Sequence, residues 1–180
     1  MRLTESGLHF DFDEARWSVV RWDGSAPARA QANALPETCA TDFVAILDSE
    51  VLYLIEVKNY ATFERRKEED LDVEIARKVH DTVVGLIGAH RRESLGDVSA
   101  VALTAMRGDL RRIVVVFWYE PHAFGRRDGT PDMRRVAAIL QVVRNRIAGK
   151  LKWLHVTVVT RATSDGVAPL PGIRVTRSGA

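Results

Sequence analysis

The run IVVVFWY at residues 113–119 constrains the fold more than any other stretch of the chain. Seven apolar residues in succession predict a β-strand covered on both faces, because a strand with one face in water alternates apolar and polar residues. Two predicted helices flank this strand in the sequence, at 70–92 and 130–149. Strands that alternate with long helices predict an α/β protein in which helices flank a mixed central sheet.

The two long helices are predicted from the spacing of their apolar residues, which recur every three or four positions. Acidic residues begin 70–92 and arginines end it, as the helix macrodipole favours. In 130–149, Thr130 suits the N-cap, Pro131 the first helical position and Gly149 the C-terminal stop. The apolar positions expected to face the core are Leu71, Ile75, Val79, Val83 and Leu86 in the first helix and Val136, Ile139, Leu140, Val143 and Ile147 in the second.

The two ends of the chain are predicted to differ in order. Residues 8–24 alternate apolar and polar residues on both sides of DEA, which predicts a β-hairpin within an N-terminal segment 1–24. Residues 161–180 are rich in Pro, Gly and Ser and are predicted to form a loose tail, with a short edge strand at IRVT. The remaining predicted elements are short helices at 27–35 and 97–106 and a strand at 153–159.

The composition is typical of a single globular domain, which we expect to span 1–180. Hydrophobic residues make up 46% of the chain and charged residues 28%, which suffices for a core and argues against wholesale disorder. The single cysteine, Cys39, excludes an internal disulfide and a cysteine-cluster zinc site. The start of the chain, MRLTESGLHFDFDE, has no apolar stretch long enough for a signal peptide, and no run approaches the length of a membrane span. We therefore expect a soluble cytoplasmic protein without a membrane partner.

The segment TDFVAILDSEVLYLIEVKNY, residues 41–60, joins two apolar runs through the turn signal DSE. If the hairpin folds about Ser49, residues equally far from Ser49 face each other, and Asp42 lies opposite Glu56. Residues opposite each other, or two apart on one strand, point to the same face of a sheet. Asp42, Glu56 and Lys58 are therefore predicted to converge at one end of an apolar face. A slip of one residue in the turn would abolish this convergence.

This set of charges suits metal-dependent hydrolysis of a phosphodiester. Two carboxylates close together repel each other, and a divalent cation offsets that repulsion directly. Mg²⁺ is usually held by one or two carboxylates, waters and substrate phosphate oxygens. A bound cation polarises the phosphodiester and lowers the pKa of an attacking water. Lys58 would then hold that water or neutralise the charge that develops on the phosphorus centre.

On these residues the chain resembles the PD-(D/E)XK nuclease superfamily. The resemblance rests on Asp42, then thirteen residues, then EVK at 56–58, on two adjacent predicted strands followed by a helix. The run DFVAILDSEVLYLIEVKN is also similar to the nuclease-related branch, in which E-V-K-N closes the strand. The resemblance implies a restriction-endonuclease-like αβββαβ core, a metal held by Asp42 and Glu56, and hydrolysis assisted by Lys58.

Two positions depart from the family pattern. Thr41 stands where the nominal motif has Pro, a common change in the superfamily. Some members add a Glu from the first helix, but the predicted helix at 27–35 has no acid, and Glu37 lies just after it.

The helix at 70–92 offers further candidates. Glu74, Lys78 and Asp81 line one of its flanks. Helices at this point in the superfamily often supply accessory residues, so the resemblance implies such a catalytic role for Lys78. The alternative is a surface ion pair between Glu74 and Lys78, which are four residues apart.

Charge is divided unevenly along the chain, since residues 1–90 have 17 acids and 10 bases whereas residues 91–180 have 7 acids and 16 bases. In the basic half, Arg135, Arg146 and Lys150 are candidate contacts to nucleic-acid phosphates. The alternative is a solvated helix face in a chain with 21 Arg and only 5 Lys.

The sequence therefore predicts a nuclease that depends on Mg²⁺ or Mn²⁺ and acts on nucleic acid, with DNA favoured over RNA. The alternative is a catalytically silent protein of the same fold that binds nucleic acid or a partner protein, because fold does not fix function. A third reading keeps the metal site but gives it RNA or a nucleotide as substrate. The chain leaves little length for a recognition domain, so we expect specificity from a homodimer or a partner protein.

Overall fold

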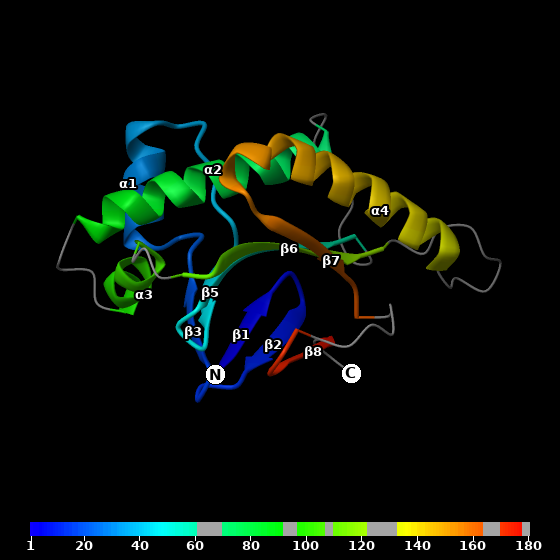
Figure 1. The fold of residues 1–180 in the computed structure, drawn as a ribbon, viewed down its shortest axis with the longest axis horizontal. Coiled ribbons are helices and arrows are strands. Elements are labelled where there is room, and N and C mark those ends of the chain that lie inside the picture. The colour runs from blue at the N-terminus through cyan, green and yellow to red at the C-terminus, as the bar shows by residue number, and fades with distance from the viewer. Residues whose placement is uncertain (61–69, 92–96, 107–109, 122–132, 164–169, 178–180) are drawn as a thin grey trace.

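The computed structural model describes residues 1–60, 70–91, 97–106, 110–121, 133–163 and 170–177. They form three layers, with helices on one face of a five-stranded mixed sheet and a three-stranded antiparallel sheet on the other (Figure 1). The predicted α/β class, with a mixed central sheet and flanking helices, is confirmed. None of the helices in these residues has the length and hydropathy that a membrane crossing requires.

The five-stranded sheet combines an antiparallel and a parallel half. Its first three strands in spatial order pair antiparallel, and its last three pair parallel. The strands are, in that order, β3 (Trp17–Arg21), β4 (Phe43–Leu47), β5 (Val51–Asn59), β6 (Arg112–Glu120) and β7 (Thr157–Arg161).

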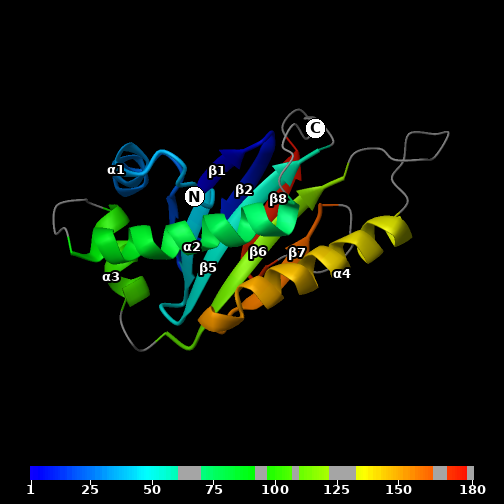
Figure 2. The ribbon, with the colours of Figure 1, turned by 90° about the horizontal axis from the view of Figure 1, so that it is seen from above.

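The helices form the second layer and cover one face of this sheet (Figures 1 and 2). The helix α2 crosses the middle of the sheet, and α4 lies beside it toward β7, as Figure 2 shows. The short helix α1 is capped by Ser25, whose side chain accepts from the Ala28 N–H. The helices are α1 (Ala26–Ala34), α2 (Leu71–His90), α3 (Asp97–Met106), α4 (Met133–Lys150) and the 3₁₀ turn η1 (Lys152–Leu154).

The three-stranded sheet consists of β1 (Arg2–Glu5), β2 (Leu8–Phe12) and β8 (Ile173–Arg177), with β2 in the middle. The predicted strand at IRVT is confirmed as β8, an edge strand, so part of the expected loose tail is built into a sheet. The predicted N-terminal hairpin is wrong in its pairing. Its two strands exist, but β2 pairs with β1 and β8, whereas β3 pairs with β4.

The pairing error has a physical cause. Alternation in β2 shows that one of its faces is buried, and Leu8, Phe10 and Phe12 are indeed buried. The partner that buries them lies far away in the sequence, since the Phe10 ring packs edge-on against Phe43 and Trp118, with centroids 5.4 Å apart in each case. The pattern of one strand therefore indicates which face is covered but not which strand lies beside it.

The two long helices are confirmed with small corrections. In α4, Gly149 lies inside the helix, which ends at Lys150, and Ile139 is 44% exposed. The buried stripe of α4 is narrow, because only Val136, Leu140 and Ile147 are fully covered at the edge of the sheet. The N-terminal signals predicted at residues 130 and 131 lie outside the described residues.

The last strand of the large sheet begins later than predicted. Residues 152–154 form the 3₁₀ turn η1, and His155 follows in the left-handed region with φ 51°. Extended structure starts only at Thr157, and Trp153 is 58% exposed rather than part of a strand. The chain reverses direction after α4, and this reversal includes the first residues of the segment 153–159 that is predicted as a strand.

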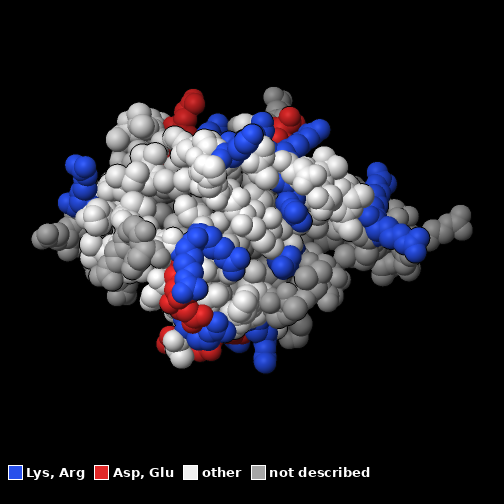
Figure 3. All heavy atoms as spheres, viewed as in Figure 1, with Lys and Arg blue, Asp and Glu red and all other residues white. Residues whose placement is uncertain are grey.

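The surface of α4 is basic. Between Met133 and Lys150 the sequence has no acidic residue, and the arginines of this helix are exposed. Figure 3 shows blue atoms at the outer end of α4, on the right of that view. The exposed basic residues are Arg134, Arg135, Arg144, Arg146 and Lys150.

Candidate functional site

The register of the β4–β5 hairpin is the one predicted. Phe43 pairs with Ile55 and Leu47 with Val51, so the extension of β4 by one residue places Asp42 opposite Glu56. The turn uses two residues in the left-handed region, Asp48 with φ 50° and Ser49 with φ 60°. The turn therefore holds the alignment on which the candidate site depends.

The face of the hairpin that carries Glu56 is covered by helices. Val44, Ile46, Leu52 and Leu54 belong to the core cluster under α2, α3 and α4. Glu56 is two residues beyond Leu54 on β5, so it points to the same side. Its side chain has no exposed surface, which is exceptional for a glutamate. The strand thus buries a carboxylate at the end of an apolar stripe.

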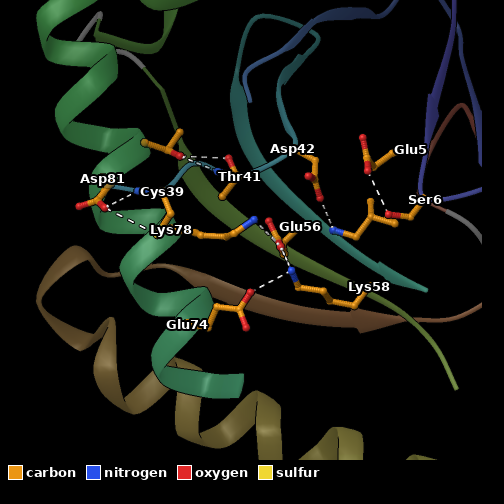
Figure 4. A network of polar contacts seen from close by, with 12 residues as sticks. Glu5, Ser6, Cys39, Thr41, Asp42, Glu56, Lys58, Glu74, Lys78 and Asp81 are labelled. Carbon is orange, nitrogen blue, oxygen red and sulfur yellow. Dashed lines mark hydrogen bonds and ion pairs between the residues drawn. The ribbon is translucent and has the colours of Figure 1, made fainter. Parts of the chain in front are cut away.

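Two lysines meet the carboxylate of Glu56 from different elements (Figure 4). The Lys58 Nζ on β5 and the Lys78 Nζ on α2 each lie 2.8 Å from Glu56 Oε1. Lys58 Nζ is also 2.9 Å from Oε1 of Glu74, one turn before Lys78 on α2. The structure therefore brings the sequence-predicted Glu56, Lys58 and Lys78 together and adds Glu74 to them.

The alternative of a surface pair between Glu74 and Lys78 does not describe these residues. Both are buried, and each reaches across to β5. Asp81, on the same flank, has a different role: its Oδ2 accepts the Cys39 N–H at 3.0 Å. One turn of α2 thus supplies the site, and the next turn fastens the chain that enters β4.

The buried carboxylate of Glu56 is incompletely satisfied. Its Oε1 lies 2.8 Å from both ammonium groups, whereas its Oε2 is buried and has no hydrogen-bond partner among the described residues. A buried acceptor without a hydrogen bond costs about 1–3 kcal/mol. Such an atom in a folded protein requires an explanation, and a missing ion is one.

The side chain of Asp42 continues the hydrogen bonding between β4 and β5 just beyond the end of β4. Its Oδ2 accepts the Val57 N–H at 2.6 Å, at the point where β5 extends beyond β4. The residue is 7% exposed. Burial first, and then the negative charge of Glu56, raise the pKa of the Asp42 carboxyl well above its ordinary value. An added cation between the two carboxylates would relieve this repulsion.

Both lysines are held in their charged form. Burial lowers the pKa of Lys58, but Glu56 and then Glu74 outweigh this effect and raise it. Burial likewise opposes the charge of Lys78, and Glu56 together with Asp42 raises its pKa above the ordinary value. Neither lysine is therefore suited to accept a proton from water as a general base. Each can orient an oxygen ligand or stabilise negative charge.

The chain before β4 is fastened to α2 by threonines. The Thr41 N–H donates to Thr82 Oγ1 at 2.9 Å, and both residues are fully buried. Thr41 stands at the position where the nominal family motif has Pro, which has no N–H to donate. Thr41 thus makes a hydrogen bond that a proline could not make, and this bond sets Asp42 beside α2.

The donor set suits a magnesium-type ion rather than a protein cage. Within the part of the chain that the structure describes, there is no group of three or more His, Cys, Asp or Glu side chains that could hold a metal. Asp42 and Glu56 provide two carboxylates, which is the number that Mg²⁺ sites commonly use along with water and phosphate. The incompletely satisfied Glu56 and the raised pKa of Asp42 fit such an ion.

Other predicted residues lie away from this cluster. Glu37, after α1, is exposed. On α4, Arg135 and Arg146 are exposed, and Lys150 Nζ lies 3.5 Å from Asp72 Oδ2 in the first turn of α2. Lys150 therefore bridges two helices, and the structure does not bring these three basic residues to Glu56.

The sequence places Glu74 on the flank of α2 and makes it the alternative surface partner of Lys78, but it does not assign Glu74 to the site. The available signal was its position four residues before Lys78, on the same flank of α2. The chain matches no family model, no curated protein and no solved structure. The chemistry of the site must therefore be argued from its own residues.

Proposed function

We propose that the chain is a metal-dependent nuclease of the PD-(D/E)XK type that hydrolyses phosphodiester bonds in DNA. The observation that carries this proposal is the convergence of Asp42, Glu56 and Lys58 at the end of one hairpin, with an incompletely satisfied buried carboxylate among them. Charged residues are expensive to bury, and function is a common reason to retain them.

The roles follow from the contacts. Asp42 and Glu56 would hold Mg²⁺ or Mn²⁺, which when bound polarises the scissile phosphodiester and acidifies a water. Lys58 would stabilise negative charge that develops on the phosphate, since Glu56 and Glu74 keep it protonated. Lys78 would orient the Glu56 carboxylate from the helix side. Glu74 would hold the Lys58 ammonium in place.

If the chain has a restriction-endonuclease-like core, one strand of that core comes at a different point in the chain order than in the family. The family order has three strands between its two helices, whereas β4 and β5 alone lie between α1 and α2 in the described residues. The strand β3 precedes α1 and pairs antiparallel with β4 on the side away from β5. We take β3 as the strand that completes the core.

Nucleic acid is the expected class of substrate because the helix packed beside α2 has a basic surface. The helix α4 has five exposed basic residues and no acid, and it packs beside α2, the helix that supplies Glu74 and Lys78. Contacts of Lys and Arg to phosphates contribute a large part of nucleic-acid affinity and depend strongly on salt. A partner protein or a second copy of the chain would add sequence preference.

One observation favours the alternative of a silent nuclease-fold protein. Lys78 Nζ is as close to Glu56 Oε1 as Lys58 Nζ is, at 2.8 Å. The two ammonium groups balance the charges of Glu56 and Glu74 without any metal. In that case the hairpin end would be a structural ion-pair network, and the protein would bind nucleic acid or a partner protein without cutting.

Cleavage of supercoiled plasmid and of labelled DNA and RNA oligonucleotides tests the proposal. Purified protein is compared in Mg²⁺, in Mn²⁺ and in EDTA, beside Lys58→Ala and a control, Lys152→Ala. Lys152 is exposed on η1 and takes no part in the cluster. We expect metal-dependent cutting of DNA that Lys58→Ala lowers by roughly a hundredfold or more, as for the loss of one transition-state contact.

The outcomes separate the hypotheses. Cutting by the parent and by Lys152→Ala but not by Lys58→Ala supports the site. Cutting that survives in Lys58→Ala contradicts the assignment of Lys58. Binding of DNA without cutting in any metal favours the silent alternative. If the protein cuts RNA but not DNA, RNA takes the place of DNA as the proposed substrate.

A further inference from the structure

A cavity lies on the face of the five-stranded sheet that is opposite the helices and the Glu56 cluster. It has a volume of about 510 Å³, within the range of small-molecule sites, and it opens where the end of β7 meets β8. Arg161 on β7 and Arg174 on β8 line it, beside the apolar surfaces of Trp118 and Ile173. Two arginines thus share a cavity that also has an apolar wall.

The strand register shows that this cavity is separate from the Glu56 cluster. Along the parallel strands, Val57 is aligned with Trp118, and Trp118 with Arg161. Val57 and Trp118 pack in the core between the two sheets, whereas Glu56 points to the helices. Successive residues of a strand point to opposite faces, so Arg161 faces away from the proposed nuclease site.

Arg161 has an unused donor. Its Nε is buried and has no hydrogen-bond partner among the residues that the structure describes, while its Nη1 donates to the Thr160 carbonyl at 2.9 Å. A guanidinium presents donors in a planar fork that matches a carboxylate or a phosphate. Leaving one of those donors buried and unsatisfied is costly, unless a ligand accepts from it.

Neighbouring acids offset the arginines of the cavity only in part. Asp11, on its wall, is bound by Arg2, with contacts of 2.7 and 3.0 Å to its two oxygens, and it also lies opposite Arg174 across β2 and β8, so that its charge acts on Arg174 as well. Glu120 accepts from Arg177 at 3.0 Å. Among the described residues, no carboxylate forms an ion pair with Arg161 or with Arg174. Among the described residues that line the cavity, two arginines therefore stand against one aspartate.

We propose that this cavity binds a small ligand with an oxyanion group, a phosphate or a carboxylate, through Arg161 and Arg174. The apolar body of the ligand would lie against Trp118 and Ile173. The site is independent of the proposed nuclease function, because no residue of the Glu56 cluster lines it.

Isothermal titration at constant ionic strength tests this inference. The full chain is titrated separately with inorganic phosphate and with succinate, which distinguish the two oxyanion classes. The variants are Arg174→Ala and Arg161→Gln, and the control is Arg29→Ala, an exposed arginine on α1. Circular dichroism verifies the fold of each variant. Arg174 is exposed, so its variant is expected to fold even where Arg161→Gln does not.

We expect saturable binding of at least one anion, with one site per chain. Arg174→Ala should weaken it by roughly tenfold or more, the effect of losing a hydrogen bond to a charged group, while Arg29→Ala leaves it unchanged. Absence of saturable binding of either anion at millimolar concentration overturns the proposal. Equal binding by Arg174→Ala and the parent overturns it as well.

Discussion

Glu56 places a carboxylate without exposed surface within 2.8 Å of two ammonium groups. The convergence of this residue with Lys58 and Asp42 could be predicted from the sequence, because two apolar runs of similar length flank one turn. The contact of Glu74 with Lys58 could not. It depends on how α2 crosses the sheet, and the spacing within one helix contains no information on that crossing.

Replacement of Glu56 by Gln should destabilise the protein by about 3–5 kcal/mol, because it leaves the buried Lys78 without its ion-pair partner and Lys58 with Glu74 alone. Urea unfolding measures the change, with the exposed Glu37→Gln as the matched control, for which we expect no more than about 0.5 kcal/mol. Adding Lys78→Met to Glu56→Gln should restore part of the loss. A Glu56→Gln protein as stable as the parent would contradict the described network.

Asp42 makes the stability depend on pH. Its pKa is raised in the folded state, so the folded protein binds this proton more tightly than the unfolded chain does. The contribution of Asp42 to the free energy of unfolding therefore falls as the pH rises through and above the range in which an ordinary carboxyl group titrates. Asp42→Asn should be more stable than the parent near neutral pH, and the difference should vanish at about pH 4 and below. Unfolding at several pH values measures it, and an equal difference at every pH would oppose this account.

At the scale of elements, local sequence patterns predict that a helix or strand exists better than they predict which other elements lie beside it. The helices α1, α2 and α3 and the strand β6 lie within a residue or two of the predicted ranges, because each has its own periodicity or end signals. The 3₁₀ turn at Lys152–Leu154 was missed because its apolar residues suggest a strand, although Trp153 remains exposed.

The turn of the β4–β5 hairpin gives a direct test at this scale. Ser49 has φ 60°, a value that proline cannot adopt and glycine adopts freely. Ser49→Pro should therefore lose more than about 1 kcal/mol of stability, whereas Ser49→Gly should keep or increase the parent value. Thermal unfolding compares the two variants. Equal melting temperatures for both would mean that this turn does not set the register.

At the scale of the whole molecule, the layer order could not be read from the sequence. The α/β class follows from the alternation of helices and strands, but the second sheet joins segments from both ends of the chain, β1 and β2 with β8. Short strands with one buried face have many equivalent partners until the rest of the fold is present. The described residues nevertheless show one consequence, a core between the sheets that contains Phe10, Phe43 and Trp118.

Truncation after Leu170 tests the contribution of β8. It removes Ile173, which is 4% exposed, and uncovers an edge of β2. We expect a loss of more than about 2 kcal/mol, the value of burying one large aliphatic side chain. Truncation after Arg177 is the matched control, since it leaves β8 intact. If the two truncated proteins unfold alike, the second sheet does not depend on β8.

The central claim is that Asp42 and Glu56 together take a divalent cation. Titration with Mn²⁺, followed by electron paramagnetic resonance, measures this without assuming a substrate. The account predicts one saturable Mn²⁺ site per chain. This site should be lost in Asp42→Asn, which should fold at least as well as the parent near neutral pH, and it should be kept in Glu37→Gln. Absence of saturable binding by the parent, or unchanged binding by Asp42→Asn, would contradict the account.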